Sequence, residues 1–144
     1  MPFVFLFKLY TVGHIYADIE LINEGDIEMA RRSLMHIDDV RKITVSALVD
    51  TGALLMAINE NIQEYLQLPI VETRPLELAN GKMLECPIGA PLMVRFKDHT
   101  AHCSAVILPG DSEPLLGAIP LEEMNVIIDP QRQELVPSPH FIRV

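Results

Sequence analysis

One acidic residue, Asp50, stands where a carboxylate could do chemistry. It follows a β-branched run at residues 43–49 and opens the tripeptide Asp50-Thr51-Gly52, whose glycine permits a tight turn. An acid at the end of a buried strand either caps the turn with its hydrogen bonds or serves a reaction. The tripeptide alone does not separate these interpretations, because average residue usage supplies it by chance in roughly a few per cent of chains this long.

The elements that would position Asp50 are mostly strands. Alternating or β-branched runs predict strands at residues 14–22, 43–49, 92–96, 101–108, 126–128 and 134–136. Two or three short helices complete the pattern. We expect one that Asp26 caps, with Ile27, Ala30, Leu34 and Ile37 at helical spacing; one that Asn59 caps, with Ile62, Tyr65 and Leu66 before Pro69; and one that begins near Pro120, with Glu122 and Glu123 in its first turn.

A hairpin is the strongest local signal after the Asp50 loop. Asn80-Gly81 separates the runs 76–79 and 82–85, and this dipeptide favours a two-residue type I′ turn. That turn would pair Leu78 with Met83 and Glu77 with Leu84.

Length and composition limit the class of protein. The 144 residues fit one domain, and 49% hydrophobic residues with a mean hydropathy of +0.25 favour a packed core. A net charge of −9 disfavours a nucleic-acid partner. We expect residues 14–144 to form a single domain, and residues 1–13 to be an N-terminal extension or an edge or interface strand.

The same features favour a soluble, cytoplasmic protein without a membrane partner. Two cysteines are too few for a disulfide framework. The apolar opening at residues 1–7 is too short to span a bilayer, and it lacks the basic start and cleavage site of a signal peptide.

Three features in a fixed order resemble the retropepsin-like aspartic proteases, and more closely their microbial single-domain members. They are the strand running into Asp50-Thr51-Gly52-Ala53, the hairpin some thirty residues later, and Leu115-Leu116-Gly117 before a helix. The resemblance spans roughly residues 14–136. It implies a closed acid-protease β-barrel, and it implies no cofactor and no metal.

The resemblance also implies a mechanism. In this family two carboxylates share a proton, so that one activates water and the other protonates the carbonyl oxygen of the scissile peptide. The chain holds a single Asp-Thr-Gly, so the second Asp50 would come from another copy across a two-fold interface. The expected function is therefore that of a homodimeric aspartic endopeptidase acting on a peptide or unfolded protein.

Other residues take roles by the same resemblance. Thr51, Gly52 and Ala53 would support the catalytic loop, with the Thr51 hydroxyl bonded to the partner's loop. The hairpin would be a flap that presents Leu78, Asn80, Gly81 and Met83 to substrate. Leu54, Leu55, Leu115, Leu116 and Gly117 would form the cleft wall, the last three packing behind the loop.

The sequence departs from the viral pattern at matching places. Leu54 and Leu55 stand where viral relatives carry acids that bind the substrate backbone, and Ala118 replaces their arginine. Acid and arginine are absent together, which implies a more apolar cleft. Residues 23–42 are expected to be an insertion relative to the compact viral form.

Two other interpretations remain open. The chain could be a peptide-binding or regulatory module that retains the fold without turnover. It could also be a metal- or cysteine-dependent hydrolase using His99, His102, Cys103 or Cys86. The second is disfavoured, because His102 and Cys103 would point to opposite faces of a strand and neither cysteine lies in a recognisable catalytic loop.

Overall fold

A computed structural model describes residues 14–78 and 80–139, which form a mostly β structure with three α-helices and a short 3-10 helix. The strands are β1 (Tyr16–Asn23), β2 (Lys42–Val49), β3 (Met56–Asn59), β4 (Ile70–Glu77), β5 (Met83–Phe96), β6 (His99–Leu108), β7 (Leu115–Leu116), β8 (Val126–Asp129) and β9 (Glu134–Pro137). The helices are α2 (Glu24–Arg31), η1 (Ile37–Asp39), α3 (Glu60–Leu66) and α4 (Ala118–Glu123). Residues 1–13, predicted to be an extension or edge strand, lie outside the described residues. The mostly β fold class is confirmed.

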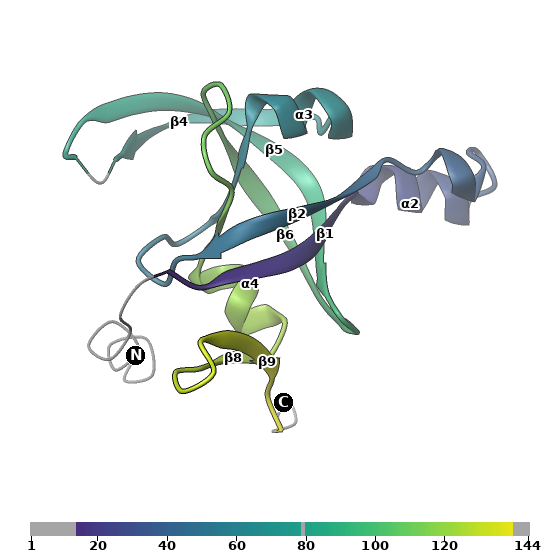
Figure 1. The fold of residues 1–144 in the computed structure, drawn as a ribbon. Helices are drawn as coiled ribbons and strands as arrows, with labels where there is room; N and C mark the ends of the chain where they lie inside the picture. The colour runs from purple at the N-terminus through teal and green to yellow at the C-terminus, as the bar shows by residue number, and fades with distance from the viewer. Residues whose placement is uncertain (1–13, 79, 140–144) are drawn as a thin grey trace.

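The main sheet is a closed barrel (Figure 1). Its strands run in the order β1-β2-β7-β3-β6-β5-β4, and β1 also pairs with β5 between residues 20–23 and 92–95. This pairing closes the ring from β1 to β5 and leaves β4 outside it as an edge strand. Closure pairs edges that would otherwise be open to other chains. β8 and β9 form a separate two-stranded sheet.

The short strand β7 explains how the Asp50 loop is held. It inserts between β2 and β3, running parallel to β2 with Leu48 beside Leu115, and antiparallel to β3 with Ala57 beside Leu115. The segment between β2 and β3 is therefore fixed at both ends by one neighbouring strand.

Two apolar clusters fill the barrel. The larger contains buried residues from β1, β2, β3, β5 and β6 together with Leu66, Leu116 and Met124. The smaller joins Ala57, Cys86, Ile88 and Val106, with partly buried leucines around it. These leucines are not fully covered, so this second cluster forms an apolar floor that is open on one side.

One predicted helix cap is confirmed, and the other two predicted helices differ from the structure at their ends. Asn59 caps α3 as predicted, its Oδ1 accepting from the backbone N–H of Ile62 at 2.8 Å. α4, however, begins at Ala118, so Glu122 and Glu123 lie in its last turn and the prediction of acids in its first turn is wrong.

The α2 prediction also needs correction. Asn23 is the cap, accepting from the backbone N–H of Asp26 at 3.1 Å, and the helix ends at Arg31. Leu34 and Ile37 lie beyond it, 66% and 64% exposed, so their helical spacing was misleading.

The flap hairpin has a different turn from the predicted one. Leu78 O accepts from Gly81 N at 2.9 Å, Leu78 N donates to Lys82 O at 2.8 Å, and Gly81 has a φ of 83°. This is a three-residue loop whose glycine takes the left-handed position. The extra residue moves the register by one, so Glu77 pairs with Met83.

Asp26 ties the segment between β1 and β2 to its surroundings. Its carboxylate accepts from the Arg41 side chain at 2.8 Å through both oxygens and from the Arg41 backbone N–H at 3.0 Å. Hydrogen bonds from the Arg41 side chain are the main reason that the pKa of Asp26 is lowered; burial opposes them. α2 lies at the end of β1 and β2 away from Asp50 (Figure 1), so this pair is remote from the candidate site.

We expect Asp26→Asn to lower the free energy of unfolding by about 1–3 kcal/mol near neutral pH, because a charged, buried acceptor is lost. A lowered pKa means that this stabilisation is present above the ordinary aspartate pKa and is lost as the pH falls through the folded-state value. In urea unfolding, the free energy of unfolding of the wild type should fall toward that of Asp26→Asn as the pH is lowered from about 6 to about 3. Asp38→Asn, at an exposed carboxylate, should change stability by less than about 0.5 kcal/mol at either pH. A difference in stability between wild type and Asp26→Asn that stays constant over this pH range would show that the Asp26 charge is not its source.

None of the helices within residues 14–78 and 80–139 is long and apolar enough to cross a membrane.

Candidate active site

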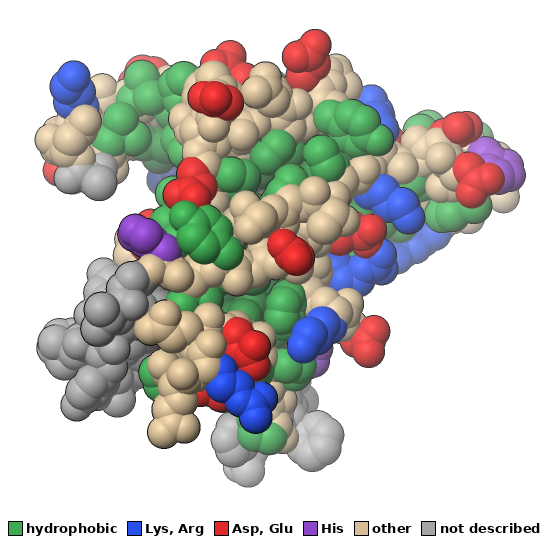
Figure 2. All heavy atoms as spheres, in the orientation of Figure 1, with side chains coloured by type: hydrophobic (Ala, Val, Ile, Leu, Met, Phe, Trp, Pro, Cys, Tyr) green, Lys and Arg blue, Asp and Glu red, His purple; other side chains and the backbone are tan. Residues whose placement is uncertain are grey.

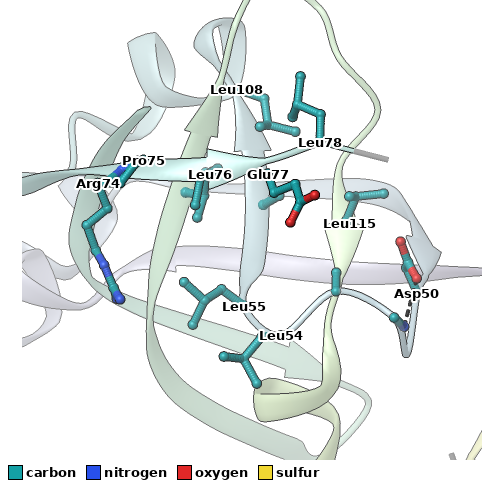
Figure 3. Close-up of a pocket in the computed structure, with 14 residues that line it drawn as sticks. Asp50, Leu54, Leu55, Arg74, Pro75, Leu76, Glu77, Leu78, Leu108 and Leu115 are labelled. Carbon is teal, nitrogen blue, oxygen red and sulfur yellow. Dashed lines mark hydrogen bonds between the residues drawn. The ribbon is translucent and has the colours of Figure 1, made fainter. Parts of the chain in front are cut away.

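Asp50 lies directly after β2, in a tight turn made by its own hydrogen bonds. Its side-chain Oδ1 accepts from the backbone N–H of Gly52 at 2.9 Å, and its carbonyl accepts from Ala53 N at 3.1 Å. Its backbone N–H donates to Leu116 O at 3.0 Å. These bonds fix the loop and direct the half-buried carboxylate toward a pocket, as Figure 3 shows.

The segment after β7 holds the other end of the loop. The backbone N–H groups of Ala118 and Ile119 donate to Ala53 O at 2.8 Å and to Leu54 O at 3.0 Å. Gly117 makes this contact possible, since a Cβ there would lie 2.2 Å from Leu55 O. The catalytic-loop candidate is thus held at both of its ends by main-chain bonds to residues 116–119, and Ala118 takes part through its backbone.

Thr51 is buried, with 8% of its surface exposed, while Gly52 is exposed. A buried hydroxyl usually requires a hydrogen-bonding partner. That the partner's loop supplies it stays a prediction.

The pocket beside Asp50 has a volume of about 500 Å³. Aliphatic side chains form most of its lining. Its lining residues are Asp50, Gly52, Ala53, Leu54, Leu55, Ala57, Arg74, Pro75, Leu76, Glu77, Leu78, Val106, Leu108 and Leu115. The open floor of the smaller core cluster is therefore also the floor of this pocket.

The structure separates the predicted flap residues. Leu78 lines the pocket, whereas Asn80, Gly81 and Met83 are not among its lining residues. Met83 is 64% exposed, because the three-residue turn pairs it with Glu77 and not with Leu78. Asn80 instead stabilises the turn, its Oδ1 accepting from Lys82 N at 3.0 Å.

The predicted wall residues also divide. Leu54, Leu55 and Leu115 line the pocket. Leu116 is fully buried in the larger cluster, because neighbouring residues of a strand face opposite sides; it belongs behind the loop and not in the wall. Gly117 contacts the loop from the same rear side.

Several residues of the lining were not predicted from the sequence. Arg74 and Pro75 belong to β4, whose residues 70–75 were not predicted as a strand because Pro75 interrupts the pattern. Val106 and Leu108 were predicted to be in a strand, but their position in the pocket lining depends on the parallel pairing of β6 with β3.

The surroundings of the two cysteines, His99 and His102 disfavour the cysteine and metal interpretations. Burial, followed by the charges of Glu123 and Glu24, raises the pKa of Cys103 to about 12, and burial also raises the pKa of Cys86. A thiol nucleophile needs the opposite shift. His99 Nδ1 lies 2.7 Å from Met124 O, and the ring of His102 pairs with Glu24.

A closed barrel with an Asp-Thr-Gly loop between β2 and β3, a hairpin beside the pocket and a glycine-terminated strand behind the loop defines the retropepsin-like acid-protease class. The model of the family described as gag-polyprotein putative aspartyl protease matches residues 35–123, more than half of the chain, and the chain belongs to that family. The predicted family is thereby confirmed. A search of curated proteins finds no match.

Proposed function

We propose that this protein is an aspartic endopeptidase whose catalytic carboxylate is Asp50. The observation that carries the proposal is the position of Asp50, in a loop held at both ends by main-chain bonds, at the edge of an open, largely aliphatic pocket. A structural turn cap would not need a neighbouring pocket, and the family of the chain supplies the matching chemistry.

Peptide hydrolysis by this route needs two carboxyl groups. One carboxylate takes a proton from water as the water attacks the carbonyl carbon, and a second, protonated carboxyl gives a proton to the carbonyl oxygen. The chain has one Asp-Thr-Gly sequence. The second carboxyl group is therefore that of Asp50 in a symmetry-related copy, and the active form is a homodimer.

The other site residues act through this pair. Thr51, Gly52 and Ala53 keep the loop in place, and Leu116 and Gly117 support it from behind. Leu78 belongs to the hairpin that closes over substrate, with Asn80, Gly81 and Met83 at its tip. The leucines of the pocket, Leu54, Leu55 and Leu115 among them, receive an apolar side chain of a peptide or unfolded protein.

A peptide library cut by wild type, beside sedimentation to fix the oligomer, tests this proposal. Cleavage next to apolar residues by a dimer supports it. A peptide-binding module, the alternative, would give affinity for the same peptides without turnover at any pH.

A further inference from the structure

Arg74 is the one cation among the described residues that line the pocket. The remaining lining residues are apolar or glycine, apart from the carboxylates Asp50 and Glu77. The whole chain carries a net charge of −9, so this cation differs in sign from most of the charge around it. Figure 2 shows acidic side chains spread over the visible face of the molecule.

The register of the flap hairpin directs Arg74 to its inner face. Residues directly opposite in a sheet share a face; Arg74 pairs with Cys86 and Leu76 pairs with Leu84. Cys86 is only 1% exposed and belongs to the pocket floor cluster, so this face is the one that looks inward. Arg74 therefore stands beside Leu76, over apolar side chains.

Arg74 and Asp50 lie on opposite sides of the pocket. In Figure 3 the leucines 54, 55 and 76 lie between them, and Glu77 lies between Leu76 and Asp50. The pocket thus has a basic side at Arg74, an aliphatic middle, and an acidic side at Asp50.

The guanidinium of Arg74 remains available to a ligand. Its ion pair within the described residues joins Nε to Glu72 Oε1 at 3.7 Å, with side chains 60% and 54% exposed. That separation exceeds a hydrogen bond, and exposed pairs of this kind contribute little. A guanidinium presents a planar fork that binds a carboxylate through two parallel hydrogen bonds.

We propose that Arg74 is a specificity-determining residue that selects substrates carrying a glutamate or aspartate at a fixed distance from the scissile bond, beyond the residue in the leucine-lined pocket. The homodimer holds two copies of Arg74, so the same distance applies on either side of the bond. Glu77 and the overall acidic charge would repel a carboxylate placed elsewhere along the cleft. The substrate is thus an apolar segment with an acidic residue on one side or on both. This inference rests on the proposed peptidase function, because it names the substrate of the same site.

The test uses peptides that share an apolar centre and carry glutamate, its neutral isostere glutamine, or lysine at successive positions on either side of that centre. With wild type, kcat/KM should favour glutamate over glutamine by about tenfold at one distance from the apolar centre, on either side of it, and added salt should reduce this ratio. Arg74→Gln should bring the ratio near one, and Arg74→Glu should favour lysine there. Arg132→Gln, at an arginine that pairs with Asp129 and Glu134 away from the pocket, should keep the wild-type ratio.

Binding separates a failure of this inference from a failure of the peptidase. Asp50→Asn, followed by fluorescence anisotropy, should bind the glutamate peptide about tenfold more tightly than the glutamine peptide, and adding Arg74→Gln should remove the difference. Selective binding without cleavage by wild type would leave Arg74 its role and overturn the peptidase. Equal handling of both peptides, no binding of either, or a preference that survives Arg74→Gln would overturn the role of Arg74.

Discussion

Asp50→Asn is expected to reduce kcat/KM for peptide cleavage by on the order of 10³-fold or more while the protein still folds. An amide cannot take a proton from water, and in the dimer the substitution removes both members of the pair. The structure should persist, because an asparagine oxygen can still accept from Gly52 N as the Asp50 Oδ1 does at 2.9 Å. Peptide cleavage kinetics, with circular dichroism and sedimentation on the same samples, measure both parts.

Asp98→Asn is the matched control. Asp98 is an exposed acid in the turn between β5 and β6 and is not a lining residue of the pocket. This variant should cleave peptides at the wild-type rate. Turnover retained by Asp50→Asn would remove Asp50 from the chemistry.

Gly117→Ala is expected to have the largest structural effect, destabilising the protein by about 3 kcal/mol and reducing activity with it. The new methyl group would lie 2.2 Å from Leu55 O and 2.8 Å from Ala53 O, both of them backbone atoms of the Asp50 loop. Main chain cannot rotate aside as a side chain can, so β7 and the loop must separate. Urea unfolding and peptide cleavage measure the two effects.

Gly110→Ala separates this clash from ordinary glycine effects. Gly110 has a φ of 60°, which disfavours alanine, but no atom lies within 4 Å of the place that the new methyl group would occupy. We expect a cost of about 1 kcal/mol and normal cleavage. Equal stability losses at the two glycines would show that the close approach behind the loop is not what holds the site.

The parts of the fold that depend on local chemistry could be predicted from the sequence. β2, the Asn59 cap and the order of the three family features follow from β-branched runs, a side-chain acceptor and motif spacing, and the structure agrees with each. Asp50 could be located in the same way, because a motif fixes it within one stretch of chain.

The errors arose where tertiary contacts decide. An Asn-Gly dipeptide suits a two-residue turn, yet the turn that ends at Gly81 has three residues. The register of the whole flap hairpin shifts by one residue as a result. Leu34 and Ile37 keep helical spacing beyond the end of α2 but have no core to pack against. Arg74 joins the site only because β4 pairs with β5 above the pocket, which no local pattern could indicate.

The structure shows where the residues that depart from the viral pattern lie. Leu54 is 65% exposed and lines the pocket with Leu55, so the positions that carry acids in viral relatives present apolar surface here. Ala118 donates its backbone N–H to the loop. Charge for holding substrate would then have to come from elsewhere, and Arg74 is the candidate on the opposite side of the same pocket.

Subunit mixing tests the proposal that two copies of Asp50 form one active site. Wild type is mixed with increasing amounts of Asp50→Asn under conditions that allow dimers to exchange, and peptide cleavage is compared with the same amount of wild type alone. Since a mixed dimer holds a single aspartate, activity should fall to about half at equal amounts and to about a tenth at ninefold excess of the variant. Activity that does not change with added Asp50→Asn, while labelled subunits are seen to exchange, would contradict the shared site.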